Sequence, residues 1–163
     1  MKLLFILLLL FQSFSTQAEV AKNVLVEQSF ARAAIQQQRN SAAYMNVTNI
    51  GGKASIVYAK SPVAKIVELH THINDRGIMR MRKINQIELP NQKMVQLKPG
   101  GLHIMMLGLN RDLKSGDFVA VTLGFDDGSE KLLQVPVQNT MKKMKKSMKA
   151  YKKDGSLPKL ITH

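Results

Sequence analysis

The sequence contains no cysteine and no tryptophan among its 163 residues. Without a thiol, the chain cannot form disulfides, thiolate zinc sites, iron–sulfur clusters or a cysteine nucleophile. Acidic residues are also scarce, 11 against 24 Lys and Arg, and aromatic residues make up only 6% of the chain. Methionine is abundant by contrast. Its ten residues and the four histidines are the only soft or borderline metal ligands in the sequence.

The motifs of common enzyme classes are missing as well. The chain has no Gly-x-Ser-x-Gly elbow, no His-Glu-x-x-His motif, no phosphate-binding loop and no paired carboxylates near its histidines. We therefore predict that the protein is not an enzyme. A blue-copper electron carrier is excluded too, because its metal site needs a cysteine thiolate.

Residues 1–18 have the layout of a secretory signal peptide. Met1 and Lys2 precede an apolar run from Leu3 to Phe11, which a polar, small-residue stretch ending at Ala18 follows. The apolar run is well short of the roughly 20 residues that a membrane-spanning helix needs. We expect cleavage after about Ala18. Export combined with a lack of cysteine is typical of the bacterial periplasm, where a thiol-based metal site is open to oxidation.

Residues 19–138 are predicted to form one all-β domain, because short apolar and β-branched runs alternate there with turn-forming residues. This pattern predicts an antiparallel β-sandwich. A long amphipathic helical period is missing from the domain, so we expect helix only in the C-terminal tail. The runs of strand length are residues 24–32, 42–49, 55–60, 66–72, 78–84, 94–97, 102–107, 118–125 and 131–137.

The tail, residues 139–163, carries most of the excess positive charge. Its eight lysines and one acid contribute +7 to the formal net charge of +13. Met141, Met144, Met148 and Tyr151 fall at helical spacing, so the tail is expected to be helical or disordered. It has no arginine and one aromatic residue, which favours an anionic membrane surface over nucleic acid as its partner.

Three histidines and several methionines cluster between residues 70 and 106. Side chains two residues apart share one face of a strand, so such pairs could hold a metal together. Two imidazoles and two thioethers would select Cu(I), because thioether sulfur is a soft ligand. Alternatively, Met79, Met94 and Met106 fill core gaps, and the protein is an exported structural or interaction domain without a metal role. The pairs are His70 with His72, Met79 with Met81, and His103 with Met105.

The spacing of His70, Met81, His103 and Met105 resembles the H-x10-M-x21-H-x-M motif of the periplasmic copper chaperones called PCu(A)C. The similarity covers about residues 24–137 and extends to residues 41–45, 67–70, 77–82 and 97–105. Two features depart from the family pattern: Leu102 replaces a frequent tyrosine, and a second histidine lies two residues after His70.

This resemblance implies a cupredoxin-like β-sandwich that binds Cu(I) through His70, Met81, His103 and Met105. It also implies delivery of copper to the copper centre of cytochrome c oxidase, directly or with a Sco-type partner. The additional histidine, His72, is a candidate substitute or fifth ligand. A second copper site in the tail is not expected, because its lysines repel cations.

Overall fold

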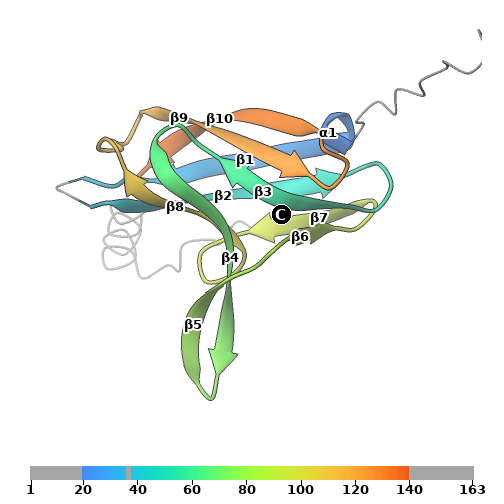
Figure 1. Cartoon of the computed structure of the whole chain (residues 1–163), viewed down its shortest axis with the longest axis horizontal. Coiled ribbons are helices and arrows are strands. Elements are labelled where there is room, and N and C mark those ends of the chain that lie inside the picture. The colour runs from blue at the N-terminus through green and yellow to red at the C-terminus, as the bar shows by residue number, and fades with distance from the viewer. Residues whose placement is uncertain (1–19, 36–37, 140–163) are drawn as a thin grey trace, which may run out of the picture.

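The computed structural model describes residues 20–35 and 38–139 (Figure 1). The predicted signal peptide and the tail methionines lie outside the described residues, so both remain predictions, as do the domain boundaries. Within the described residues, no helix is long and apolar enough to cross a membrane.

The described chain is almost entirely β-strand, as predicted. A single helical turn, α1 Val20–Asn23, precedes the first strand, so the expectation of helix only in the tail is wrong for this turn. Each predicted run overlaps a strand, whereas β6 was missed because three residues are too few to show a period. The strands are β1 Val24–Arg32, β2 Asn40–Asn49, β3 Ala54–Lys60, β4 Ala64–Asp75, β5 Ile78–Lys83, β6 Ile87–Leu89, β7 Lys93–Leu97, β8 His103–Leu109, β9 Phe118–Phe125 and β10 Glu130–Gln138.

The strands form one continuous path in the order β5-β4-β8-β2-β1-β10-β9-β3-β6, with β7 paired to β2. Neighbouring named strands pair antiparallel except β1 and β10, which run parallel where Ala31 lies beside Val137. The predicted antiparallel arrangement is therefore wrong at this pair. Turn signals indicate how consecutive strands are joined, but no turn connects the first strand to the last.

The hydrophobic core takes residues from both halves of this strand path. Ile104 and Met106 of β8, Leu69 of β4 and Phe125 of β9 belong to one buried cluster. Met106 is thus a core residue, as the packing interpretation predicted. Because strand side chains alternate between faces, the residues next to Leu69 and Ile104 in sequence point away from this core.

Two of the three methionines considered as core residues lie at the surface instead. Met79 is 56% exposed and Met94 is 49% exposed. The gap-filling interpretation is therefore wrong for both. Met79 lies on β5 and Met94 on β7, and both strands are mostly exposed to solvent. The composition of such short strands does not reveal which of their faces packs against the core.

The hairpin of β4 and β5 projects beyond the rest of the domain (Figure 1). Its turn residues, Arg76 and Gly77, have φ angles of 53° and 85°, as a two-residue type I′ turn requires. The side-chain oxygen of Asn74 accepts a 2.7 Å hydrogen bond from the Gly77 N–H. All residues of β5 are exposed, so the hairpin presents both of its faces to solvent near its tip.

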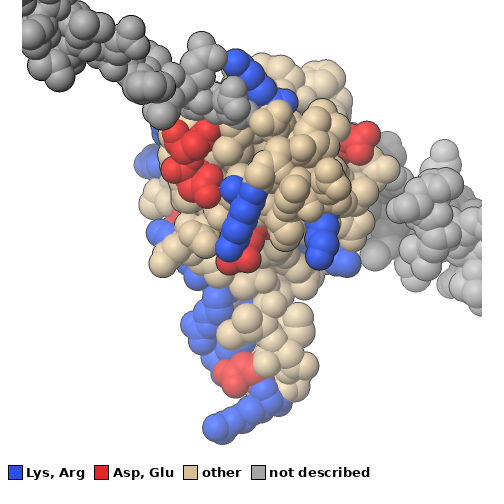
Figure 2. Space-filling view, turned by 90° about the vertical axis from the view of Figure 1, so that its right-hand side faces the viewer, with Lys and Arg blue, Asp and Glu red and all other residues tan. Residues whose placement is uncertain are grey.

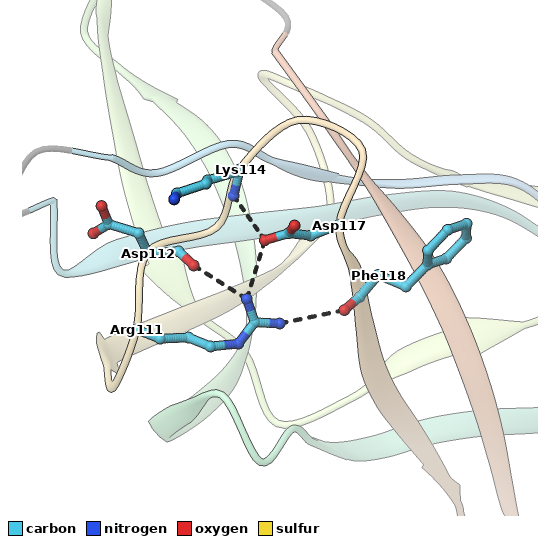
Figure 3. Close-up of polar contacts among 5 residues, drawn as sticks. All are labelled: Arg111, Asp112, Lys114, Asp117 and Phe118. Atoms are coloured by element: carbon cyan, nitrogen blue, oxygen red, sulfur yellow. Dashed lines mark hydrogen bonds and ion pairs between the residues drawn. The ribbon is translucent and has the colours of Figure 1, made fainter.

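Polar contacts close the loop that follows β8 (Figure 3). The Arg111 guanidinium donates to the Asp117 carboxylate at 3.1 Å and to the carbonyl oxygens of Asp112 and Phe118. The Lys114 N–H and this guanidinium hold the pKa of the Asp117 carboxyl below its usual value. The network anchors the chain between β8 and β9, at the end of β8 opposite His103.

Candidate metal centre

Strand register brings the four predicted ligands onto one face of the β5-β4-β8 segment. Directly opposed residues on neighbouring strands share a face, as do residues two apart on one strand. The His70–His103 pair forms the middle rung, with a methionine one rung away on either side. The opposed pairs are Glu68 with Met105, His70 with His103, and His72 with Met81.

The three imidazoles gather around His103. Its ring centroid lies 5.6 Å from that of His70 and 5.3 Å from that of His72. Tyr44 of β2 covers the other side, with ring centroids 6.1 Å apart. Direct cross-strand neighbours have Cβ atoms about 4.5–5.5 Å apart, and diagonal ones remain within reach of long side chains. Methionine has three rotatable side-chain bonds, so sulfur atoms on the adjacent rungs can turn toward the histidine pair.

His103 is buried, with 2% of its surface exposed. Its Nδ1 lies 2.9 Å from the carbonyl oxygen of Gly101. A carbonyl oxygen can only accept, so Nδ1 carries the proton and the lone pair is on Nε2. Burial is the main cause that lowers the pKa of His103, against the opposing effect of the Gly101 hydrogen bond. The ring is therefore neutral near pH 7, with Nε2 available as a ligand atom.

His70 has the opposite tautomer. Its Nε2 lies 2.9 Å from a carboxylate oxygen of Glu68, so Nε2–H donates and the lone pair is on Nδ1. Nδ1 is buried and has no hydrogen-bond partner in the described structure. An unsatisfied buried polar group typically costs about 1–3 kcal/mol. A metal ion bound at Nδ1 would satisfy it, and the carboxylate–histidine pair is the usual support of a metal-bound imidazole.

Glu68 is the supporting residue whose role the sequence did not reveal. Its second carboxylate oxygen accepts from the Lys83 ammonium at 2.9 Å. The hydrogen bonds from Lys83 and then His70 lower the pKa of this carboxyl, so Glu68 stays ionised as an acceptor for His70. Its position two residues before His70 was a usable signal, because both side chains face the same way. The other nearby acid, Asp75, instead pairs with Arg80 at 3.2 Å.

The metal hypothesis depends on the methionine sulfur atoms. Within residues 20–35 and 38–139, no group of three His, Asp or Glu side chains is arranged to hold a metal ion. Met105 is half-buried, whereas Met81 is 42% exposed. The arrangement therefore consists of two imidazoles with defined lone pairs, one half-buried thioether and one thioether that is largely exposed to solvent.

Several solved structures have a similar fold, and PCuAC domains are among them. The copper-bound PCuAC domain from PmoF2 matches with a TM-score of 0.61 and 21% identity, covering 72% of this chain and 93% of that domain. The solution structure of Cu(I)-DR1885 from Deinococcus radiodurans matches with a TM-score of 0.58 and 29% identity, covering 76% of this chain and 87% of that one. The likeness confirms the predicted resemblance and the cupredoxin-like fold.

The family model described as "Putative lipoprotein LpqE-like" matches residues 24–137, and the chain belongs to the LpqE-like family. The "Putative lipoprotein Lxx21020" of Leifsonia xyli subsp. xyli (strain CTCB07) is 34% identical over 129 residues, which are 78% of this chain and 76% of that protein. The "Uncharacterized protein RP573" of Rickettsia prowazekii (strain Madrid E) is 35% identical over 117 residues, 69% of this chain and 65% of that protein. A family described as lipoproteins agrees with the predicted export.

Proposed function

We propose that this protein is an exported copper chaperone that carries one Cu(I) bound by His70, Met81, His103 and Met105. The observation that carries the proposal is the buried, unpartnered Nδ1 of His70, on the same face as the other three ligands. The copper-bound PmoF2 domain and Cu(I)-DR1885 share the fold, which supports copper as the cargo.

The donor set suits Cu(I) and its transfer. Two neutral imidazoles and two thioethers add no negative charge and contain soft sulfur, a combination that favours Cu(I) over Zn(II) or Mg(II). The Nδ1 of His70 and the Nε2 of His103 would bind the ion from inside the site. Met81 is the exposed ligand, so an acceptor protein would reach the ion from the Met81 side of the site. The protein thus carries copper without catalysing a reaction.

The periplasm is the proposed location, and the copper centre of cytochrome c oxidase is the proposed destination, reached directly or through a Sco-type partner. The signal-like residues 1–18 and the family's lipoprotein description support export. The recipient is proposed from the resemblance of the His70-to-Met105 motif to that of the PCu(A)C chaperones.

Anaerobic exposure of residues 19–163 to equal amounts of Cu(I) and Zn(II), followed by metal analysis, tests the proposal. We expect one Cu(I) per chain and little zinc, because uncharged thioethers bind a borderline dication weakly. Zinc retained in preference to copper would contradict a soft site. A chain that retains neither metal would support the alternative, an exported structural or interaction domain.

Methionine variants test the ligand assignment. Met81→Leu and Met105→Leu are expected to weaken Cu(I) binding strongly with the fold intact, because leucine conserves volume and such exchanges usually cost under about 1.5 kcal/mol. Competition with a chromophoric Cu(I) chelator measures the affinity. Met94→Leu is the matched control, since Met94 is also an exposed strand methionine. Equal binding by all three variants would show that the methionines are not ligands.

The tail is proposed to attach the protein to an anionic membrane surface. Truncation after Gln138 removes +7 of the formal charge and is expected to weaken binding to anionic vesicles. The binding that the tail contributes is expected to be sensitive to salt, because such attraction is screened beyond about 8 Å at physiological ionic strength. Vesicle co-sedimentation at low and high salt measures this effect. Cu(I) affinity is expected to stay unchanged, and its loss would place a tail methionine or His163 in the site.

A further inference from the structure

Three side chains of types that can bind a soft metal lie on the outer half of the β4–β5 hairpin: His72, Met79 and Met81. Met81 is directly opposite His72, and Met79 is directly opposite Asn74. Met79 and Met81 are two residues apart, so they share the face on which His70 and His103 lie. His72 and Met79 have no part in the ligand set proposed above, whereas Met81 belongs to it.

Exposure rises steadily along this face toward the hairpin tip. His103 is 2% exposed and the His70 side chain 12%. The corresponding values are 42% for Met81 and 56% for Met79. An ion held between His70 and His103 is thus enclosed by protein, whereas one held by Met79 and Met81 is open to an approaching ligand.

His72 is positioned to serve either location. Its ring centroid lies 5.3 Å from that of His103. Its Nδ1 is 3.4 Å from the carbonyl oxygen of Gly101, which already accepts from His103 at 2.9 Å. At 3.4 Å the second contact is a weak hydrogen bond, so the His72 ring can turn at little cost. With its proton on Nδ1, its lone pair is on Nε2.

The arginines of β5 lie on the face of the strand opposite to that of Met79 and Met81, because strand side chains alternate between faces. Arg80 and Arg82 alternate with Met79 and Met81 along β5 and therefore point to the reverse face, where Arg80 pairs with Asp75. Figure 2 shows the projecting hairpin with Lys and Arg along one side and uncharged residues along the other. Lys83 shares the methionine face, but its ammonium is bound to Glu68. Repulsion of a cation is therefore weakest on the methionine side of the tip.

We propose that His72, Met79 and Met81 form a second Cu(I) position through which copper leaves the enclosed one, an inference that rests on the proposed function. Met81 stays bound throughout the movement. The bonds from copper to His70 Nδ1, His103 Nε2 and the Met105 sulfur break as bonds to His72 Nε2 and the Met79 sulfur form. Copper remains Cu(I), no electron is exchanged, and the released imidazoles stay neutral. The exposed ion is then captured by the ligands of the acceptor.

Transfer kinetics test this inference in the variants His72→Asn, Met79→Leu and the two combined. The exported chain is loaded with Cu(I) and mixed in a stopped-flow instrument with excess bathocuproine disulfonate. We expect the combined variant to release copper on the order of tenfold more slowly than the parent, because the ion loses an intermediate that lowers the exit barrier. Equilibrium affinity is expected to stay within about threefold of the parent value, since the enclosed ligands are unchanged. Met94→Leu is the control and is expected to match the parent in both measurements.

A second measurement isolates the outer position. In a His103→Ala background the enclosed position is disabled, and we expect residual, weaker Cu(I) binding that His72→Asn or Met79→Leu removes. A combined variant that releases copper as fast as the parent, or residual binding that neither substitution affects, would overturn the inference alone. A parent chain that does not bind Cu(I) would overturn the proposed function as well.

Discussion

Replacing His103 with alanine is expected to lower the affinity for Cu(I) by more than about 100-fold, beyond the usual cost of losing a supporting residue around a metal. The substitution removes the most buried residue of the proposed ligand set, whose ring is already neutral and oriented by Gly101. Competition with a chromophoric chelator measures the affinity. Chemical denaturation of the copper-free variant checks that the cavity left by the ring has not unfolded the domain.

Glu68→Gln provides the graded comparison. Glutamine keeps the shape of Glu68 but loses the charged acceptor that holds His70 Nε2–H, so we expect a decrease of about 10–100-fold. Asp75→Asn is the matched control, because its carboxylate is on the reverse face of the hairpin and pairs with Arg80. Parent-like affinity in both His103→Ala and Glu68→Gln would show that copper binds elsewhere.

Copper affinity is expected to fall in acid. An imidazole must be neutral to bind a metal, whereas methionine has no proton to lose. Affinity is therefore expected to be roughly flat above neutrality and to fall below about pH 6.5, by at most about two decades per pH unit. Burial lowers the pKa of His103, so protonation of this ring begins at lower pH than for an exposed histidine. The part of the decrease in Cu(I) affinity that comes from protonation of His103 is accordingly expected at the more acidic pH values.

Chelator competition between about pH 5 and 8 measures this dependence in the parent and in His70→Ala, His72→Ala and His103→Ala. Each ligand variant, His70→Ala or His103→Ala, is expected to have a limiting slope of about one decade per unit, because one imidazole remains to be protonated. His72→Ala is expected to keep the parent slope. An affinity independent of pH in the parent would remove histidine from the coordination sphere.

The same burial makes the copper-free fold sensitive to acid. His103 has a lower pKa in the folded chain than the roughly 6.5 of an unfolded one. Between these two values the unfolded state binds more protons, so stability decreases as the pH falls below about 6.5. Bound copper holds His103 neutral and should protect the fold in this range.

Local sequence patterns were sufficient to predict where the strands lie and which neighbouring side chains share one face of a strand. Runs of apolar residues bounded by turn formers placed nearly every strand, because the two-residue period of a strand and the φ demands of turns are local properties. The same period predicted that His103 and Met105 share one face of their strand, and that Met79 and Met81 share one face of theirs. The excess of methionine and histidine over cysteine and acids indicated a soft metal before any contact was known.

The contacts between strands, in contrast, depended on the tertiary structure. The rung that joins His70 to His103 is set by the pairing of β4 with β8, and the parallel pairing of β1 with β10 joins the two ends of the domain. The Glu68 and Gly101 acceptors lie only two residues before the histidines that they contact, but the tertiary structure decided which ring nitrogen each one meets, and so which nitrogen carries the lone pair. A strand's period determines which side chains share its face, but the partner strand and its register depend on packing the whole core, where a one-residue shift turns every side chain to the other face.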